Sequence, residues 1–404
     1  MKQGWRLTNL GSVCTVQRGS SPRPIKDPRF FDGGTIPWIK IADATKSGKY
    51  LYDTKQKVNA FGASFSRKLP PNSLILAASG TLGCVQLLGV EGCIHDGWLH
   101  LYDFEGLDHE FAYYWLKANV HLSSDAAYGA AIQNINTELL RSFPIDLPPL
   151  PVQKRIAAIL SAYDDLIEVN TRRIAILEEM ARRIYEEWFG YATRVSYDTV
   201  SEDAQCALQP LDALATDKRD SVIPSELAPD TLYVGLEHLS RRSFTLVDHG
   251  AVEAVSSTKL TFKRGDVLFG KIRPNFHKIA FAPGRGVCSS DTIVLRPKQP
   301  QWGPLILLCA FSDRFVEHAT ATSNGTKMPR ANWNVLRRYA VPKVTTEDLE
   351  TFNGAVLPMI QLTATLAQQN ANLRAQRDLI LPRLVSGKLD VSGLDTVEKE
   401  LAHA

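Results

Sequence analysis

The chain has 404 residues, which is enough for two or more domains of roughly 100–200 residues each. Hydrophobic residues make up 44% of it and charged residues 22%, a balance that excludes a disordered or collagen-like chain. The net charge of +3 excludes a histone-like polycation but not a nucleic-acid-binding protein, because binding depends on where the charge lies. We expect no membrane segment and no signal peptide, and the scattered cysteines indicate a reducing cytoplasm.

The first predicted element is a β-rich domain over residues 1–149. Short strand-like runs such as Ser73–Ala78 and Gly97–Tyr102 are separated by Gly, Pro, Asn and Asp turns. Its loops carry basic side chains, and arginine and lysine contact phosphates and guanine edges while Asn and Gln bind adenine. The DNA-contact candidates here are Arg18, Ser20, Ser21, Arg23, Lys26, Lys40, Lys46, Lys49, Ser79, Thr81, Gln133 and Asn134.

The second predicted element is a long helix, Val152–Phe189, within the segment 150–195. Prolines at 148, 149 and 151 exclude an earlier start, because proline suits only the first helical turn. Apolar residues then recur at alternating spacings of four and three, the heptad pattern of a coiled coil. The helix-pairing candidates are Ile156, Leu160, Ile167, Asn170, Ile174 and Leu177.

A second β-rich domain is expected over residues 196–344. Its first part, residues 197–220, is polar with few periodic signals, and we expect it to be a linker. Strand-like runs follow, among them Asp266–Lys271 and Thr292–Leu295. The DNA-contact candidates in this domain are Arg242, Lys271, Arg273, Asn275, Lys278, Asn324, Lys327 and Arg330.

The last predicted element is a second long helix, residues 347–384, in the segment 345–404. Its helix-pairing candidates are Leu366, Asn370, Leu373 and Ile380. Asn170 and Asn370 each stand in mid-helix, where a buried Asn fixes the register of paired helices. We therefore expect the two helices to pair, although each could instead pack on its own domain. Small or charged residues at Thr363, Ala367, Arg374 and Arg377 depart from a regular apolar seam.

The chain repeats itself at an offset of about 196 residues. Residues 129–141 match 325–337, with Asn136 opposite Asn332. Three further blocks match in the same order: 36–44 with 231–239, 72–83 with 265–276, and 92–101 with 286–295. The last of these places Cys93 and Asp96 opposite Cys288 and Asp291. We expect an α+β chain in which two domain-plus-helix copies form an internal pseudo-twofold repeat.

No segment of the sequence fits a known catalytic motif completely. Gly265–Ile272 fits a phosphate-binding loop except at its last position, where the Ser or Thr that binds Mg²⁺ is replaced by isoleucine. Methyltransferase and nuclease motifs do not fit either. Cys84, Cys93, His95 and His100 lack the paired spacing of a zinc site. We therefore expect a non-catalytic chain that binds neither metal nor cofactor.

Charge placement favours DNA as the ligand. Residues 1–149 hold 15 Lys and Arg against 13 Asp and Glu, and residues 196–344 hold 19 against 15. The first helix segment is neutral and the C-terminal segment is acidic. The excess positive charge therefore belongs to the two β-rich domains. A coiled-coil scaffold whose β domains bind protein remains an alternative.

Four strings in this chain are similar to those of one known family. They are Arg18–Ile25, Leu147–Ile156, Arg183–Phe189 and Arg377–Val391. On these strings the chain resembles, over nearly its whole length, the specificity subunit of type I restriction-modification enzymes.

The resemblance implies that each β-rich domain is a target recognition domain for one half of a split, asymmetric site in double-stranded DNA. It implies that the helices form an antiparallel coiled coil that sets the spacer between half-sites and docks two methyltransferase subunits. Those partners would methylate adenine with S-adenosylmethionine. Restriction subunits that use ATP and Mg would complete the nuclease.

Overall fold

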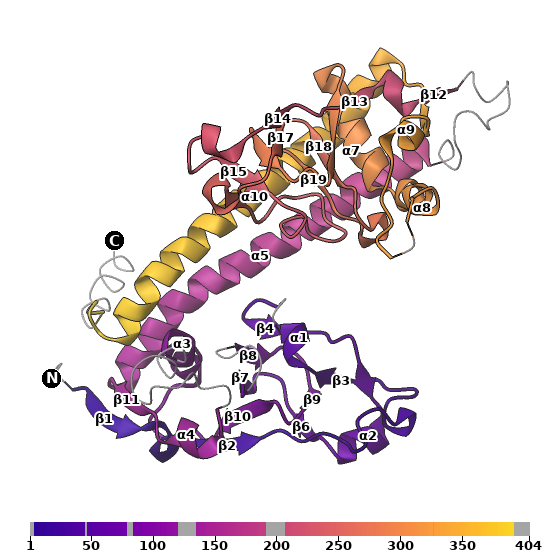
Figure 1. Cartoon of the computed structure of the whole chain (residues 1–404). Coiled ribbons are helices and arrows are strands. Elements are labelled where there is room, and N and C mark those ends of the chain that lie inside the picture. Colours follow the sequence, from indigo (N-terminus) through magenta and orange to yellow (C-terminus); the bar gives the residue numbers. More distant parts are fainter. Residues whose placement is uncertain are drawn as a thin grey trace. The chain divides into compact units, whose positions relative to one another are not determined.

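The computed structural model describes residues 4–44, 47–78, 84–119, 135–190, 207–325 and 327–391. The chain forms two compact units: the first combines Met1–Glu168 with Leu373–Ala404, and the second is Val169–Asn372. Both predicted long helices are present, α5 (Leu150–Phe189) and α10 (Thr346–Val385), and each contributes a part to both units (Figure 1). Each unit is described by itself below.

The first unit holds two main sheets. The larger has the strand order β2-β10-β7-β8-β4, and the smaller has the order β5-β3-β9-β6. The strands of the larger sheet are β2 (Thr15–Arg18), β4 (Tyr50–Leu51), β7 (Leu74–Ala77), β8 (Val85–Leu88) and β10 (Trp98–Tyr102). Those of the smaller sheet are β3 (Ile36–Ile39), β5 (Lys57–Val58), β6 (Arg67–Leu69) and β9 (Gly92–Ile94). β7 and β8 are buried along their whole length. β7 is accordingly apolar throughout, and the one polar residue of β8, Gln86, donates to the Ala44 oxygen at 3.2 Å.

The core of the first unit joins the larger sheet to the helices. Helix α3 (His109–Asn119) buries every residue of Phe111–Leu116, and in Figure 1 it lies beside the start of α5. The same apolar cluster contains Ile156 and Leu160 of α5 together with Leu384 of α10. β1 (Arg6–Asn9) and β11 (Pro144–Leu147) pair antiparallel and lead the chain into α5. Short helices α1 (Ile41–Ala44), α2 (Ala60–Ser64) and α4 (Thr137–Arg141) complete the unit.

The second unit repeats this strand order. Its sheets are β13-β21-β18-β19 and β14-β17-β20-β15-β16, with β12 and β22 as a separate pair. The first sheet consists of β13 (Ala215–Asp217), β18 (Val267–Gly270), β19 (Ile279–Phe281) and β21 (Thr292–Pro297). The second consists of β14 (Ser221–Val222), β15 (Leu232–Val234), β16 (Gly250–Ala251), β17 (Lys259–Phe262) and β20 (Gly286–Cys288). The pair is β12 (Leu208–Pro210) and β22 (Ala340–Pro342).

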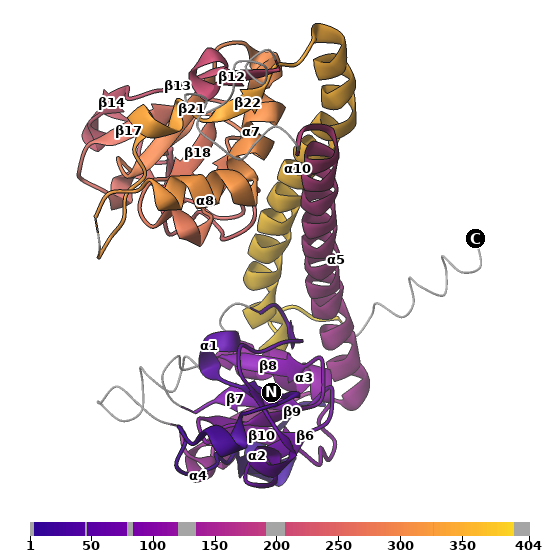
Figure 2. The same cartoon turned by 90° about the vertical axis from the view of Figure 1, so that its right-hand side faces the viewer.

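Helices complete the second core. Helix α7 (Gly303–Phe311) is buried at every position and packs beside β18 (Figure 2). Helices α8 (Asp313–Ala321) and α9 (Trp333–Leu336) follow it. Ala181 and Tyr185 of α5 and Phe352 of α10 belong to the same apolar cluster.

The internal repeat is confirmed in the part of the chain that the structure describes. β3 pairs parallel with β9 through Trp38 and Cys93, and β15 pairs parallel with β20 through Val234 and Cys288. The matched asparagines have the same role as well. Asn136 caps α4 by accepting from the amide of Leu139, and Asn332 caps α9 by accepting from the amide of Asn334.

The predicted linker is wrong for residues 207–220. They form β12, the 3₁₀ turn Leu211–Ala213 and β13, and they bury Leu211, Leu214 and Ala215 in the second core. The segment lacks periodicity because each strand in it has only three residues. Within the segment Gly265–Ile272, Val267–Gly270 form β18, so this part is a strand and not a loop. Among the described residues, no helix is long and apolar enough to cross a bilayer.

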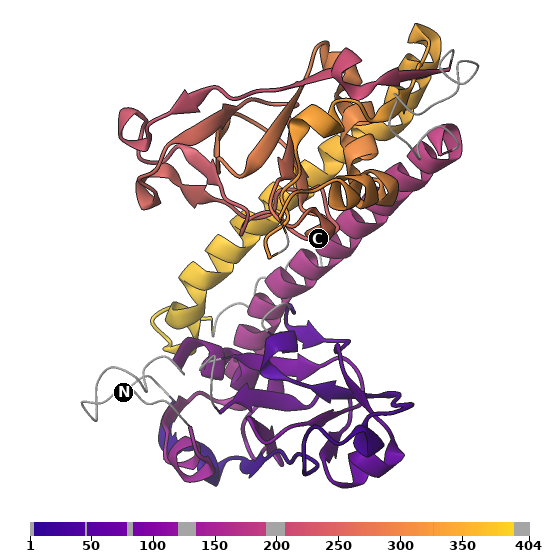
Figure 3. The same cartoon turned by 45° about the vertical axis from the view of Figure 1, so that its right-hand side comes forward.

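Within each unit the two long helices run antiparallel. In the first unit, Asp164 of α5 lies against Arg377 of α10, and Ile156 and Leu160 share a cluster with Leu384. In the second, Asn170 lies against Asn370 and Ile174 packs on Leu366. Residues later in α5 therefore meet residues earlier in α10. Figure 3 shows the last turns of α10 in yellow beside the first turns of α5 in the first unit.

Candidate nucleic-acid interface

The basic loop after β2 is fixed by the turn that precedes β10. Arg18 donates from Nε to the main-chain oxygen of Asp96 at 2.7 Å, and Ser21 donates from Oγ to the Asp96 carboxylate at 2.9 Å. Arg23 forms an ion pair with the same carboxylate while its own side chain stays 66% exposed. Ser20 is half-buried and Lys26 is exposed. The loop is held in one shape and still presents its cationic groups to solvent.

Lys40 and Lys49 have other environments. Lys40 lies over the ring of Trp38 and donates to Gln56 Oε1. Lys49 is a wrong candidate for an exposed DNA contact, since its side chain is 2% exposed and forms an ion pair with Glu110. It also donates to Ser161 of α5 at 2.9 Å. Five candidates lie outside the described residues: Lys46, Ser79, Thr81, Gln133 and Asn134.

Three basic loops meet in the second β-rich domain. The loop after β18 carries Lys271, Arg273, Asn275 and Lys278. Its Arg273 amide donates to Pro329 at 2.7 Å, and its Lys271 oxygen accepts from the amide of Ala331 at 2.9 Å. The hairpin that carries Asn324, Lys327 and Arg330 is thereby tied to it. Arg242 joins from a third loop, because its amide donates to the His277 oxygen at 3.0 Å. The candidates of this domain are therefore brought together.

The shape of this cluster is set by backbone conformation and by one aromatic ring. Arg242, Arg273 and His277 have φ values of 55°, 50° and 52°, in the left-handed region that non-glycine residues seldom adopt. Such residues persist only where the surroundings over-determine them. The Arg241 guanidinium lies 3.9 Å from the ring centroid of Phe276, and Arg273 lies 5.5 Å from it. Stacking on a ring limits the freedom of a guanidinium before any ligand binds.

Most of these side chains remain accessible. Arg273, Asn275, Asn324, Lys327 and Arg330 are exposed, and Lys271 is half-buried. Lys278 is directed inward, where its ammonium donates to the Leu236 oxygen and burial lowers its pKa. Arg242 forms an ion pair with Asp313 at 3.0 Å but keeps a 70% exposed side chain.

Both clusters occupy the same end of equivalent sheets. β2 ends at Arg18, opposite Leu99 of β10. In the second domain β18 ends at Gly270, opposite Thr292 of β21. The first cluster thus lies where β10 begins, and the second lies where β21 begins. Two domains of the same topology present positive loops at the same sheet end.

The helix seam carries buried polar contacts. Arg377 of α10 forms an ion pair with Asp164, and their side chains are 11% and 5% exposed. Tyr114 donates to the other carboxylate oxygen of Asp164 at 2.7 Å. Asn170 donates to Asn370 Oδ1 at 3.0 Å. Helix pairing through the asparagines is thus confirmed, and Arg377 is the partner of a buried acid rather than a defect in the seam.

The other pairing candidates also lie on this seam. Ile167 is buried, Leu177 packs on the cluster of Ile174 and Leu366, and Ile380 packs on the first core. Leu373 is half-buried.

Glu178 of α5 holds a loop of the second β-rich domain. One carboxylate oxygen, Oε1, accepts from the amides of Phe244 at 3.0 Å and Thr245 at 2.9 Å. It also accepts from the hydroxyls of Ser243 at 2.8 Å and Thr245 at 2.6 Å. Burial raises the pKa of Glu178 even though these donors act in the opposite direction. The contact attaches the β-rich domain to the helix.

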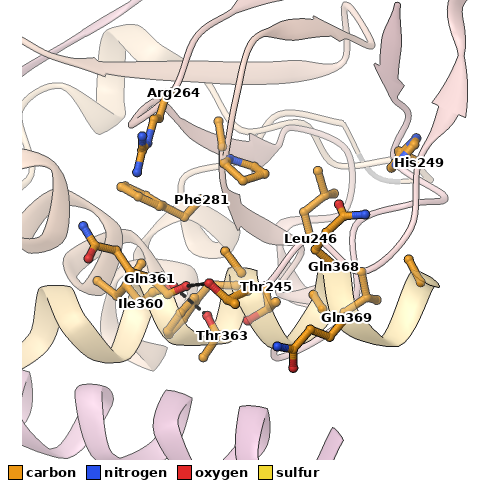
Figure 4. Close-up of a pocket in the computed structure, with 18 of the residues that line it drawn as sticks. Thr245, Leu246, His249, Arg264, Phe281, Ile360, Gln361, Thr363, Gln368 and Gln369 are labelled. Atoms are coloured by element: carbon orange, nitrogen blue, oxygen red, sulfur yellow. Dashed lines mark hydrogen bonds between the residues drawn. The ribbon is translucent and has the colours of Figure 1, made fainter. Parts of the chain in front are cut away.

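A hollow of about 660 Å³ lies between this loop and α10 (Figure 4). Leu246 and Phe281 face Ile360 and Gln361 across it, and His249 and Arg264 stand at its rim. The Thr363 hydroxyl on its floor is satisfied by the Ile360 oxygen at 2.9 Å. The described residues that line it include His249 and Arg264 but no Asp or Glu.

Known proteins of one family match this chain. A family model described as type I restriction modification DNA specificity domain matches residues 2–179. The MjaIX specificity subunit of Methanocaldococcus jannaschii is 21% identical over 96% of this chain and 94% of its own length. The EcoDI specificity subunit of Escherichia coli is 20% identical over 84% of this chain and 77% of its own.

The chain is similar over most of its length to specificity subunits of type I restriction-modification enzymes. A solved specificity subunit from M. genitalium has the same fold, with a TM-score of 0.58 at 15% identity, covering 94% of this chain and 96% of that one. The resemblance inferred from the four strings is therefore confirmed.

Three cationic residues near the basic loops escaped prediction. Arg67 donates from Nε to the Arg18 oxygen at 2.9 Å, and Arg241 stacks on Phe276. Arg219 donates to the Thr292 oxygen at 3.0 Å, as Arg18 does to Asp96. Arg219 stands two residues beyond the end of β13, the strand equivalent to β2, so the internal repeat was the signal that could have found it. In the described residues, His, Cys, Asp and Glu form no group of three that could hold a metal.

Proposed function

We propose that this chain is the subunit that gives a type I restriction-modification enzyme its DNA sequence specificity. Each β-rich domain would bind one half of a bipartite, asymmetric site. The observation that carries the proposal is the repeated topology with a basic loop cluster at the same sheet end of both domains. Because the loops differ in sequence, the two half-sites would differ as well.

The paired helices would set the unread spacer and dock two methyltransferase subunits. Adenine methylation with S-adenosylmethionine, and cleavage with ATP and Mg, would belong to the methyltransferase and restriction subunits. A base must leave the duplex to be methylated, and that step needs a pocket of its own. This chain would supply position and sequence choice, in the cytoplasm where the DNA lies.

The test is selection from a pool of randomised DNA duplexes. The full chain, alone and with its methyltransferase partner, is incubated with the pool, and the bound DNA is sequenced. We expect two short motifs separated by a gap of fixed length, with binding that weakens steeply as salt rises. Enrichment of no sequence in either condition would overturn the proposal.

A matched pair of quadruple variants separates DNA recognition from the alternative of a protein-binding scaffold. Reversing charge at Lys271, Arg273, Lys327 and Arg330 should abolish enrichment of one half-site. The control reverses charge at Lys263, Arg264, Arg285 and Lys298, which stand at the opposite end of β18, β19 and β21 and should leave both half-sites intact. A scaffold would lose no DNA binding in either variant.

A further inference from the structure

Asp96 and Asp291 stand in corresponding turns of the two copies of the repeat, Asp96 two residues before β10 and Asp291 one residue before β21. Each stands in the turn before the strand that begins at the basic loops, β10 in the first domain and β21 in the second. In both, the aspartate amide donates to a serine hydroxyl at 3.2 Å, that of Ser21 or that of Ser289. A carboxylate therefore stands in the corresponding turn of two domains whose loops otherwise differ, with its serine partner in the loop after β2 in the first domain and in the turn itself in the second.

In the first domain, Asp96 gathers the cationic loop around itself. Its carboxylate accepts from Ser21 and pairs with Arg23, while its main-chain oxygen accepts from Arg18. Burial alone would raise the pKa of Asp96, but Ser21, Arg23 and His95 lower it below its usual value. The carboxylate is thus charged, 42% exposed and next to the candidates for DNA contact.

In the second domain, Asp291 stands between two basic loops. Its main-chain oxygen accepts from the amide of Lys271 at 2.8 Å. Its carboxylate lies 3.8 Å from a guanidinium nitrogen of Arg330, and these side chains are 37% and 52% exposed. Arg330 belongs to the hairpin that pairs with Ile272. One aspartate again contacts the recognition arginine and the loop beside it.

We infer that Asp96 and Asp291 are specificity-determining residues. Each carboxylate holds one arginine, Arg23 or Arg330, until the correct half-site replaces the carboxylate as the partner of that arginine. The inference rests on the proposed function. Exposed ion pairs are worth only about 0–1 kcal/mol, so a well-placed DNA acceptor can displace the carboxylate.

The experiment compares Asp96→Asn and Asp291→Asn in the randomised-duplex selection with the full chain. Asp96→Asn should relax base preference in one half-site only, and Asp291→Asn in the other only. Affinity for non-specific duplex should rise roughly fivefold, the equivalent of about 1 kcal/mol. The slope of log K against log salt should steepen by about 0.9, because one more arginine is free to bind a phosphate.

Two controls separate this role from a general effect of charge. Asp146→Asn and Asp230→Asn remove one exposed negative charge from the first and second domains and should leave both half-sites unchanged. In a chain that already carries Arg23→Gln, Asp96→Asn should have no further effect on affinity or base preference, because it acts through Arg23. The matching background for Asp291 is Arg330→Gln.

Outcomes of three kinds would overturn the inference. The first is that each Asp→Asn variant relaxes the base preference of both half-sites or of neither. The second is that the control variants relax base preference as much as the Asp96 and Asp291 variants do. The third is that the effect of Asp96→Asn persists in the Arg23→Gln background. A wild-type chain that enriches no sequence would overturn the proposed function and this inference together. Selective wild-type binding with unchanged Asp→Asn variants would overturn the inference alone.

Discussion

The two β-rich domains share their strand order but are attached to the helices in different ways. In the first, the Leu87 amide donates to the Lys49 oxygen; in the second, the Phe281 amide donates to the Phe244 oxygen. Lys49 and Phe244 are therefore equivalent backbone positions. The Lys49 side chain pairs with Glu110 and donates to Ser161, whereas the loop at Phe244 donates its own amides to Glu178.

This difference shows which parts of a repeat remain fixed. Backbone pairing and apolar cores are retained because a strand cannot slip by one residue without exposing its buried face. Side-chain anchors are replaceable, since a buried charge can be satisfied by a lysine or by backbone amides. Each domain therefore has a polar anchor of its own, and the anchors can be broken separately.

The largest expected effect is at the buried ion pair between the two long helices in the first unit. Arg377→Met leaves Asp164 buried without its charge partner, and we expect the free energy of unfolding to fall by about 3–5 kcal/mol. Chemical denaturation followed by circular dichroism measures the change. Adding Asp164→Leu should recover most of the loss, because no unpaired charge then remains. Arg374→Met, an exposed position one turn earlier, is the control, and an equal loss in both variants would contradict the assignment.

Glu178→Ala should have the next largest effect on stability, and the loss should be in the second unit. It leaves two amides and two hydroxyls without their acceptor, and we expect a loss of about 3 kcal/mol. Hydrogen exchange at Phe244 and Thr245 should accelerate, which a merely global change would not single out. Glu187→Ala, exposed on the same helix, should change stability by less than about 0.5 kcal/mol. Unchanged protection of the loop in Glu178→Ala would show that this anchor is not needed.

The asparagine pair should have a smaller effect of opposite sign. Replacing both Asn170 and Asn370 by leucine removes two buried polar groups together, and we expect a gain of about 1 kcal/mol. Either single replacement should instead lose stability, since the remaining buried amide loses the hydrogen bond that joins the two asparagines. Denaturation of the three variants measures this, and additive effects of the two substitutions would show that the side chains do not interact.

The smallest expected effect is the pH dependence contributed by Glu178. Its folded pKa is raised above the ordinary 4.5, so its contribution is fully present below that pH and is lost as pH rises through the folded pKa. The difference in unfolding free energy between the wild type and Glu178→Gln should therefore fall as the pH rises above the ordinary pKa of 4.5. A difference that rises with pH would mean that the loop donors outweigh burial.

Sequence patterns predicted the backbone of this protein better than its side-chain contacts. The heptad seam placed both helices to within two residues of each end, and four aligned blocks identified the repeat, because periodicity and apolar burial are local signals. The short strands of residues 207–220 carry no period and were missed.

Anchors and recognition loops could not be predicted in the same way. In the sequence, Arg377 is a charged residue where the seam calls for an apolar one. Its partner Asp164 lies 213 positions away, so the sequence does not show that the two side chains meet. Glu178 looks like any charged residue on a helix, since its four donors come from a loop more than 60 positions later. Lys49 resembles a surface lysine in a basic loop, and only the fold shows that it is buried. Such contacts depend on tertiary placement that spacing alone does not contain.

The central claim is that each domain recognises one half-site while the helices set the distance between the two. It is tested most directly by adding one heptad to both helices, between Glu168 and Val169 and between Asn372 and Leu373. The insertions fall where the two units divide, so the contacts within each unit are kept. A heptad adds about 10.5 Å of helix, close to three base pairs of DNA. Selection from the randomised pool should return the same two half-sites with a gap longer by about three base pairs, and an unchanged gap or altered half-sites would contradict the account.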